Sequence, residues 1–259
     1  MPPFGAQLRE WRQRRRLSQL ELAGEADVST RHLSFVETGR AMPSREMVLR
    51  LADRLELPLR ERNRWLTAAG FAPMYAERPL DDVALAAARE AVELVLKGHE
   101  PYPALAIDRH WSLVSYNRAV LPLLEGVAPA LLQGPINVLR LSLHPEGLAP
   151  RILNFAQWRA HLLARLRQQI VASADPVLQA LADELRAYPA PAGAAHEGPE
   201  PGGVVVPLRL RTPNGTLSLI STTTVFGTPV DITLSELALE TFFPADAATG
   251  VALRAALAG

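Results

Sequence analysis

The sequence predicts an all-α N-terminal unit of five short helices, followed by an α+β unit with an antiparallel sheet. Apolar residues recur at helical spacing through residues 4–70. After residue 203 the pattern changes to alternating and β-branched residues, which is typical of strands. Hydrophobic residues make up 48% of the 259 residues, so both units can bury a core.

The first two helices are recognised by where they begin and end. One apolar face starts at Phe4, and its helix ends in a cluster of three arginines. Ser18 and Glu21 have the spacing of a capping box, in which each side chain accepts a backbone N–H of the other residue. This box opens a second helix. A tight break follows, and Ser29 can cap a third helix.

The remaining helices of the first unit are set by glycine, proline and serine. The third helix ends at Thr38-Gly39. Pro43-Ser44 starts a fourth helix, which we expect Pro58 to end. A fifth helix is predicted over about residues 59–69.

Beyond a connector with two prolines, a helix is predicted over about residues 82–97. Two short strands should flank a turn at Asp108-Arg109, with a helix from about Arg118. Residues 150–187 are expected to be largely helical, with a break at Asp175-Pro176.

The C-terminal part contains the three later strands. Residues 189–203 form a low-complexity segment that we expect to be a flexible loop. Strands are predicted within residues 204–211, 216–226 and 230–243, with Asn214-Gly215 as a hairpin turn between the first two. The chain is expected to end in a short helix.

Several classes of protein are excluded or disfavoured. The chain has no cysteine, which excludes disulfides, thiolate catalysis and cysteine-bound metal. The N-terminus has no apolar signal-peptide core, and no apolar run reaches the roughly 18 residues of a membrane span. Catalytic motifs are missing, and no two of the six histidines have metal-ligand spacing on one helix face. We therefore expect no catalytic residues, no metal, and a bacterial cytoplasmic, nucleoid-associated location.

The charge is unevenly distributed although the formal net charge is zero. Residues 1–70 hold 13 arginines and 9 acidic residues, a net charge of +4, and the rest of the chain balances this with −4. Such asymmetry is a weak indication that the first unit faces a nucleic acid.

The segment SQLELAGEADVSTRHLSFVETGRAMPS, residues 18–44, resembles the lambda-repressor-like, or XRE-type, helix-turn-helix family. The longer stretch from Arg31 to Tyr75 is similar to the MmyB-like branch, in which this domain precedes a PAS-like ligand-binding domain. The resemblance implies a DNA-binding domain over residues 1–72, a connector and helix over 73–98, and a PAS-like domain over 99–259.

The resemblance also implies where DNA is contacted. The third helix would lie in the major groove, and Arg31 is the sharpest candidate because arginine can donate two hydrogen bonds to a guanine edge. Other residues expected at base edges are Thr30, Ser34 and Phe35. Residues expected at or near phosphates are Gln19, Ser29, His32, Thr38, Arg40, Ser44 and Arg45. Arg12 and Glu37 match a pair that forms a partly buried salt bridge in the family.

For the second unit the resemblance implies a fatty-acid-like ligand, and we expect no cofactor. ALAIDRHWSLVSYNRA resembles the opening hairpin and first helix of PAS-like domains, where Trp111 and Asn117 match frequent positions. RLSLHPEGLAPRILNFAQWRAHLLARL matches the MmyB-like pattern. Pocket-lining candidates on its helix are Phe155, Trp158 and Leu162, and candidates to meet a ligand carboxylate are Arg140, His144 and Arg159. A purely structural role remains open for each of them.

We therefore interpret the chain as a DNA-binding transcription regulator that senses a small apolar ligand. It would act as a homodimer on a double-stranded, palindromic operator, because one recognition helix reads only a few base pairs. Two alternatives stay open: a DNA-binding domain fused to a lipid-directed enzyme, or to a ligand-free dimerisation domain. An enzyme needs an acid–base pair or nucleophile in its pocket, whereas a dimerisation domain needs no cavity.

Overall fold

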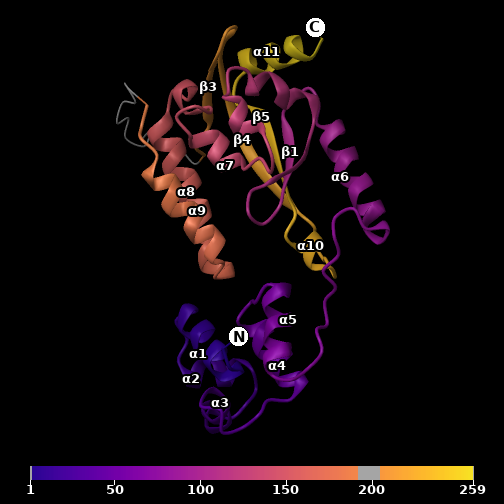
Figure 1. Cartoon of the computed structure of the whole chain (residues 1–259), viewed down its shortest axis with the longest axis vertical. Helices are drawn as coiled ribbons and strands as arrows, with labels where there is room; N and C mark the ends of the chain where they lie inside the picture. The colour runs from indigo at the N-terminus through magenta and orange to yellow at the C-terminus, as the bar shows by residue number, and fades with distance from the viewer. Residues whose placement is uncertain (1, 192–204, 259) are drawn as a thin grey trace. The chain divides into compact units, whose positions relative to one another are not determined.

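The computed structural model describes residues 2–191 and 205–258, and the chain divides into two compact units (Figure 1). The first comprises residues 1–78 with the short segments 171–174 and 230–232. The second comprises residues 79–170, 175–229 and 233–259. No helix in the described ranges is long and apolar enough to cross a membrane.

The first unit contains the five predicted helices. They are α1 (Phe4–Arg14), α2 (Gln19–Glu25), α3 (Thr30–Glu37), α4 (Arg45–Arg54) and α5 (Leu59–Ala68). Their inward faces form one core in which Leu8, Leu33, Leu51 and Trp65 are fully buried. The helical spacing of these residues therefore predicted both the helices and their buried faces.

Serine side chains fix the starts of three of these helices. Ser18 and Glu21 form the predicted capping box, since Ser18 Oγ accepts the Glu21 N–H and the Glu21 carboxylate accepts the Ser18 N–H. Ser29 caps α3 and Ser44 caps α4 through the serine hydroxyl alone, which accepts the N–H of His32 and of Met47 respectively. The prediction for Pro58 was wrong: α4 already ends at Arg54, and Pro58 is the N-cap residue of α5, where its missing N–H costs nothing.

The described part of the second unit forms a five-stranded antiparallel sheet with the order β2-β1-β5-β4-β3. The strands are β1 (Ala104–Ile107), β2 (Leu113–Tyr116), β3 (Leu208–Thr212), β4 (Gly215–Val225) and β5 (Ala238–Pro244). Two early and three late strands were predicted, which the structure confirms. The β3–β4 hairpin is also confirmed, and Gly215 has the positive φ of 120° that its turn requires.

One prediction for the C-terminal part was wrong, and another concerns residues that are mostly outside the described ranges. Residues 230–243 were expected to form one strand, but α10 (Ile232–Ser235) occupies the first half and only the second half is β5. Alternation alone cannot separate a short helical turn from a strand. Of the loop predicted over residues 189–203, residues 192–203 lie outside the described ranges.

Helices and short 3₁₀ turns surround the sheet. They are η1 (Val83–Leu85), α6 (Ala86–Gly98), η2 (Arg118–Leu124), η3 (Pro129–Leu132), α7 (Val138–Leu143), η4 (Ala149–Arg151), α8 (Phe155–Ser173), α9 (Pro176–Ala187) and α11 (Ala247–Ala258). The helix expected from Arg118 is a 3₁₀ helix with Pro122 inside it, since proline cannot donate the α-helical hydrogen bond. The predicted break at Asp175-Pro176 separates α8 from α9.

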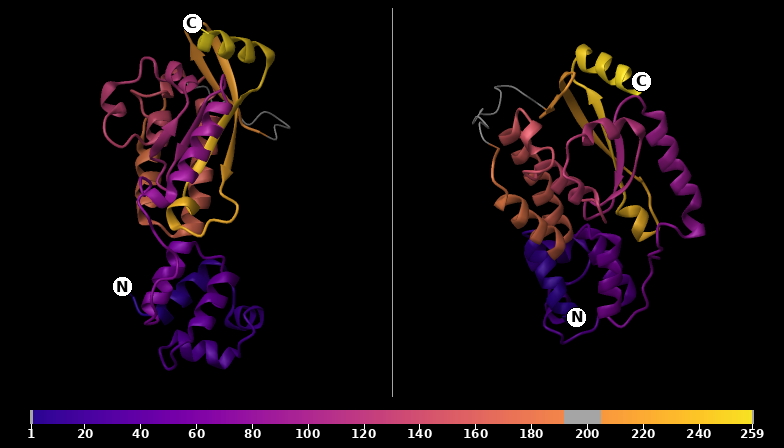
Figure 2. Two further views of the ribbon diagram at one scale, coloured as in Figure 1. Left: turned by 90° about the vertical axis from the view of Figure 1, so that its right-hand side faces the viewer. Right: turned by 45° about the horizontal axis from the view of Figure 1, so that its top comes forward.

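The two faces of the sheet pack against different helices (Figures 1 and 2). Ala104 and Ala106 of β1 pack with α6, whereas Leu105 and Ile107 belong to the larger core that includes α8. Alternate residues of a strand point to opposite faces of the sheet. In β4 and β5, too, every second side chain therefore points toward α8. That face holds the candidate ligand site.

Candidate DNA-binding and ligand-binding sites

A buried carboxylate ties the third helix of the first unit to the first two helices. Glu37, at the end of α3, accepts hydrogen bonds from Arg12 of α1 at 2.6 and 3.0 Å and from Gln19 of α2 at 2.7 Å. The side chains of Arg12 and Glu37 are 10% and 2% exposed. The hydrogen bonds that Arg12 donates to the Glu37 carboxylate raise the pKa of Arg12 above its usual value. The expected Arg12–Glu37 pair is present, and it fixes the orientation of α3.

A glycine that the sequence analysis missed lets α1 approach α3. A Cβ atom on Gly5 would lie 2.4 Å from the carbonyl oxygen of Val36 and 2.6 Å from that of Glu37. Real Cβ atoms do not come so close to backbone oxygen, so only glycine fits here. The sequence signal was weak. A glycine within a predicted helix can indicate close packing, but the sequence does not show which helix packs against it.

The residues expected at base edges lie in the first six positions of α3. Arg31 is exposed, and its guanidinium carbon lies 5.4 Å from the centre of the Phe35 ring. Phe35, Thr30 and Ser34 are half-buried. The ring of Phe35 therefore supports the Arg31 side chain along the helix surface.

The residues expected at phosphates lie at the ends of the helices around α3. Ser29 and Ser44 are exposed N-caps, and Arg45 is the first residue of α4. Thr38 donates its hydroxyl to the carbonyl of Ser34 at 2.8 Å. The other exposed candidates are His32 and Arg40, whereas Gln19 is half-buried and its amide nitrogen is held by Glu37. Helix N-termini and exposed cations suit phosphate binding.

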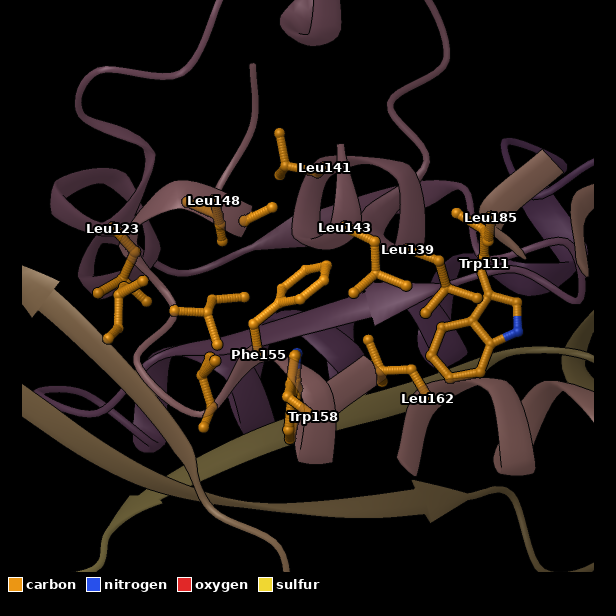
Figure 3. Packing of buried hydrophobic residues seen from close by; sticks show 14 of the residues in the cluster. Trp111, Leu123, Leu139, Leu141, Leu143, Leu148, Phe155, Trp158, Leu162 and Leu185 are labelled. Atoms are coloured by element: carbon orange, nitrogen blue, oxygen red, sulfur yellow. The ribbon is translucent and has the colours of Figure 1, made fainter. Parts of the chain in front are cut away.

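The second unit contains an apolar cavity of about 90 Å³ between the sheet and the helices α7 and α8. Trp111, Trp158 and Leu162, three of the residues expected at the ligand, line it. Figure 3 shows Trp158 and Leu162 between Leu123 on one side and Trp111 on the other. Their aromatic and aliphatic surfaces are typical of a site for an apolar molecule.

One ion pair and two hydroxyls form the polar part of this cavity. Arg165 of α8 donates to Glu240 of β5 at 2.6 and 3.2 Å, and its guanidinium lies 4.9 Å from the ring centre of Trp111. The Ser142 hydroxyl oxygen accepts the indole N–H of Trp158 at 2.9 Å, and Ser221 also lines the cavity. Burial lowers the pKa of His161, which stacks on Trp158. No group of three metal-binding side chains occurs in the described parts of the chain.

The three basic residues expected to meet a ligand carboxylate do not line the cavity. Arg140 makes two 2.8 Å hydrogen bonds to Glu184 of α9. Arg159 donates to the carbonyls of Leu185 and Arg186 at the end of α9. His144 packs edge-on against Tyr188. The structure therefore uses these side chains to join α7 and α8 to α9.

Two further candidates are buried structural residues that do not line the cavity. Asn117 donates to the carbonyls of Leu96 and Tyr102 and accepts the N–H of Ala104, so it holds the start of β1. Phe155 is 2% exposed within the large core. For these two residues the structural alternative describes the geometry better.

Arg165 and Glu240 were not predicted from the sequence. Arg165 lies seven residues after Trp158 and three after Leu162, so helical periodicity would have placed it on the same face of α8. Glu240 has no comparable signal, because its position depends on the pairing of β5 with β1 and β4.

Together these features define a DNA-binding protein with a second domain built around an apolar cavity. A family model described as the MmyB-like transcription regulator ligand binding domain matches residues 88–256. A helix-turn-helix domain model matches residues 3–65. The chain belongs to the MmyB-like transcription regulators, with DNA and a small molecule as its partners. No curated protein matches it significantly.

Proposed function

We propose that this regulator is a homodimer that reads a palindromic operator and binds a fatty-acid-like molecule in the cavity of its PAS-like domain. The observation that carries the proposal is the cavity itself, whose walls are apolar around Trp111, Trp158 and Leu162. A domain that served only for dimerisation would need no such space.

The DNA-reading half of the proposal rests on the fixed orientation of α3. Because Glu37 is bonded to Arg12 and Gln19, the exposed face of α3 is held rigidly against the rest of the domain. A rigid helix whose N-terminal residues point outward is the arrangement that reads base edges in the major groove.

Arg31→Ala and Arg40→Ala should differ in their effects on DNA binding. Loss of Arg31 should weaken specific binding by about 1–3 kcal/mol and relax the preference at one base pair of each half-site. Loss of Arg40 should weaken binding to all sequences alike. It should also reduce the slope of log affinity against log salt concentration by about one. Titrations on a selected operator and on random DNA, at several salt concentrations, measure both effects. Identical profiles for the two variants would contradict this division of roles.

The oligomeric state can be measured on the full chain. Native mass spectrometry should give twice the protomer mass of 28.2 kDa, with any co-purified small molecule as an added mass. A strictly monomeric protein, with and without operator DNA, would contradict the homodimer.

Affinity for straight-chain acyl compounds should depend on chain length. Each buried methylene contributes about 0.8 kcal/mol, or roughly fourfold in affinity. The cavity of about 90 Å³ is smaller than an engineered cavity of about 150 Å³ that binds benzene. We therefore expect the rise to stop at short or medium chains.

Straight-chain acids from butanoic to tetradecanoic acid and the alcohols of the same chain lengths, titrated by calorimetry, measure this dependence. Leu162→Phe fills part of the cavity, so the affinity should stop rising at a shorter chain length than in the wild type. Leu163→Phe is a matched control, since Leu163 follows in the same helix and does not line the cavity. If no chain binds below millimolar concentration, or if length has no effect, the lipid-sensor proposal fails.

A further inference from the structure

We propose that the cavity selects ligands with an uncharged polar head, and that Glu240 is the residue that excludes carboxylates. This inference rests on the proposed ligand-binding function and specifies the chemical class of the ligand: a fatty alcohol, ester or protonated acid rather than a fatty acid anion.

The charges at the cavity are already balanced. Among the described residues that line it, Arg165 and Glu240 are the charged ones. Arg165 gives two hydrogen bonds to the two carboxylate oxygens of Glu240, at 2.6 and 3.2 Å. Thr223 of β4 donates a further one at 2.8 Å. The polar end of the cavity is therefore neutral as a whole.

Glu240 cannot easily give up its partner. Its side chain is 5% exposed, and it lies on the central strand β5 between Leu105 of β1 and Thr223 of β4. A ligand carboxylate that took Arg165 from it would leave a buried anion without its cation, which is strongly unfavourable. A carboxylate bound beside the intact pair would meet the like charge of Glu240.

An uncharged head has hydrogen-bond partners on the wall of the same cavity. The hydroxyls of Ser142 and Ser221 line the cavity. Since Ser142 accepts from Trp158 at 2.9 Å, its own O–H hydrogen can be donated to a neutral ligand oxygen. Such a contact needs no rearrangement of the Arg165–Glu240 pair.

The test compares octanol with octanoate in the wild type and in Glu240→Gln, at about pH 8, where the free acid is ionised. The glutamine keeps the shape and an oxygen for Arg165 and Thr223 but removes the negative charge. We expect the affinity ratio of octanol to octanoate to fall by about tenfold or more in the variant. A neighbouring charge commonly shifts a pKa by about one unit, which corresponds to a tenfold change in an equilibrium constant. The greater hydrophobicity of the alcohol contributes equally to both ratios, so it cancels when the ratio of the variant is compared with that of the wild type.

Glu184→Gln is the matched control. Glu184 makes the same two-bond pair with Arg140 but does not line the cavity, so its ratio should equal that of the wild type. An unchanged ratio in Glu240→Gln, or tighter binding of octanoate than of octanol in the wild type, would overturn the inference. If neither compound binds the wild type, the proposed ligand-binding function fails and the inference fails with it. Tight octanoate binding would overturn the inference alone.

A pH titration of the wild type gives a second test that needs no stable variant. If the acid binds in its protonated form, its apparent affinity should fall by up to about tenfold per pH unit between about pH 6.5 and 8.5, while that of octanol stays constant. Arg165 and Glu240 are the charged groups among the described residues that line the cavity, and His161 lies close enough to interact with both. Arg140 of α7 is paired with Glu184. Burial lowers the pKa of His161, which favours its neutral form. A constant affinity for octanoic acid would contradict the inference.

Discussion

Replacing Glu37 by alanine should lower the free energy of unfolding of the first unit by about 3–5 kcal/mol, the cost of breaking a buried ion pair by removing one partner. The carboxylate is 2% exposed and accepts hydrogen bonds from Arg12 and Gln19. Its removal leaves the buried guanidinium of Arg12 without an anion. Because α3 is oriented by these bonds, specific DNA binding should be lost together with stability.

Thermal and urea melts of Glu37→Ala, Arg12→Ala and the double variant measure this effect. The double variant should lose less than the sum of the single variants, because each single change already breaks the pair. Glu10→Ala is the control: Glu10 pairs with Arg14 at 2.9 Å on the surface, with 57% of its side chain exposed, and its loss should cost less than about 1 kcal/mol. Strictly additive losses at Arg12 and Glu37 would show that the pair contributes nothing.

Gly5→Ala should destabilise the first unit by about 1–3 kcal/mol or more, as overpacking does in a close-packed core. The new Cβ would lie 2.4 Å from a backbone oxygen of α3. A backbone atom cannot rotate away as a side chain can, so α1 and α3 must move apart. Since the contact is at Val36 and Glu37, the movement should also tilt the recognition helix and weaken specific DNA binding.

Gly24→Ala provides the matched control for this substitution. Gly24 lies in α2, and a Cβ there would meet no atom within 4 Å. Alanine is the better helix former by roughly 0.5–1 kcal/mol, so this variant should be as stable as the wild type or more so. Chemical denaturation of both variants decides the matter. Equal stability of Gly5→Ala and the wild type would mean that α1 and α3 are not held at this distance.

The first unit could be predicted almost entirely from the sequence because its signals are local. Helical spacing identified the buried face of each helix, and the hydroxyls of Ser18, Ser29 and Ser44 identified where helices begin. Pro58 was misread because the same residue type can follow one helix and start the next. Gly5 was missed because its role depends on a contact with residues more than thirty positions away.

The candidate ligand site was only partly predictable. Trp158 and Leu162 follow from the periodicity of one long helix, and both line the cavity. Arg140, His144 and Arg159 were predicted to meet a ligand carboxylate. Their side chains instead contact α9 or Tyr188, the residue that follows it. Arg165 shares the helical spacing of Trp158 and Leu162, so it could have been predicted on the same face of α8. The position of its partner Glu240 depends on non-local strand pairing, which no spacing in the sequence encodes.

The family also accounts for the chain's architecture without defining its regulation. A helix-turn-helix domain and a ligand-binding domain on one chain make a sensor only if the ligand binds two DNA-binding states with different affinity. A ligand of equal affinity for both states would change nothing, however tightly it bound. The account therefore depends on coupling between the two activities.

The most direct test is the affinity of the full chain for an operator selected from random DNA, measured with and without saturating octanol at fixed salt. The account predicts a change in Kd of about 5–150-fold, the usual range of allosteric coupling, and an equal change in octanol affinity when operator is bound. Random DNA should show a smaller change, because its binding depends on phosphates rather than on the orientation of α3. An operator Kd that stays the same at saturating octanol would contradict the claim that this cavity controls DNA binding.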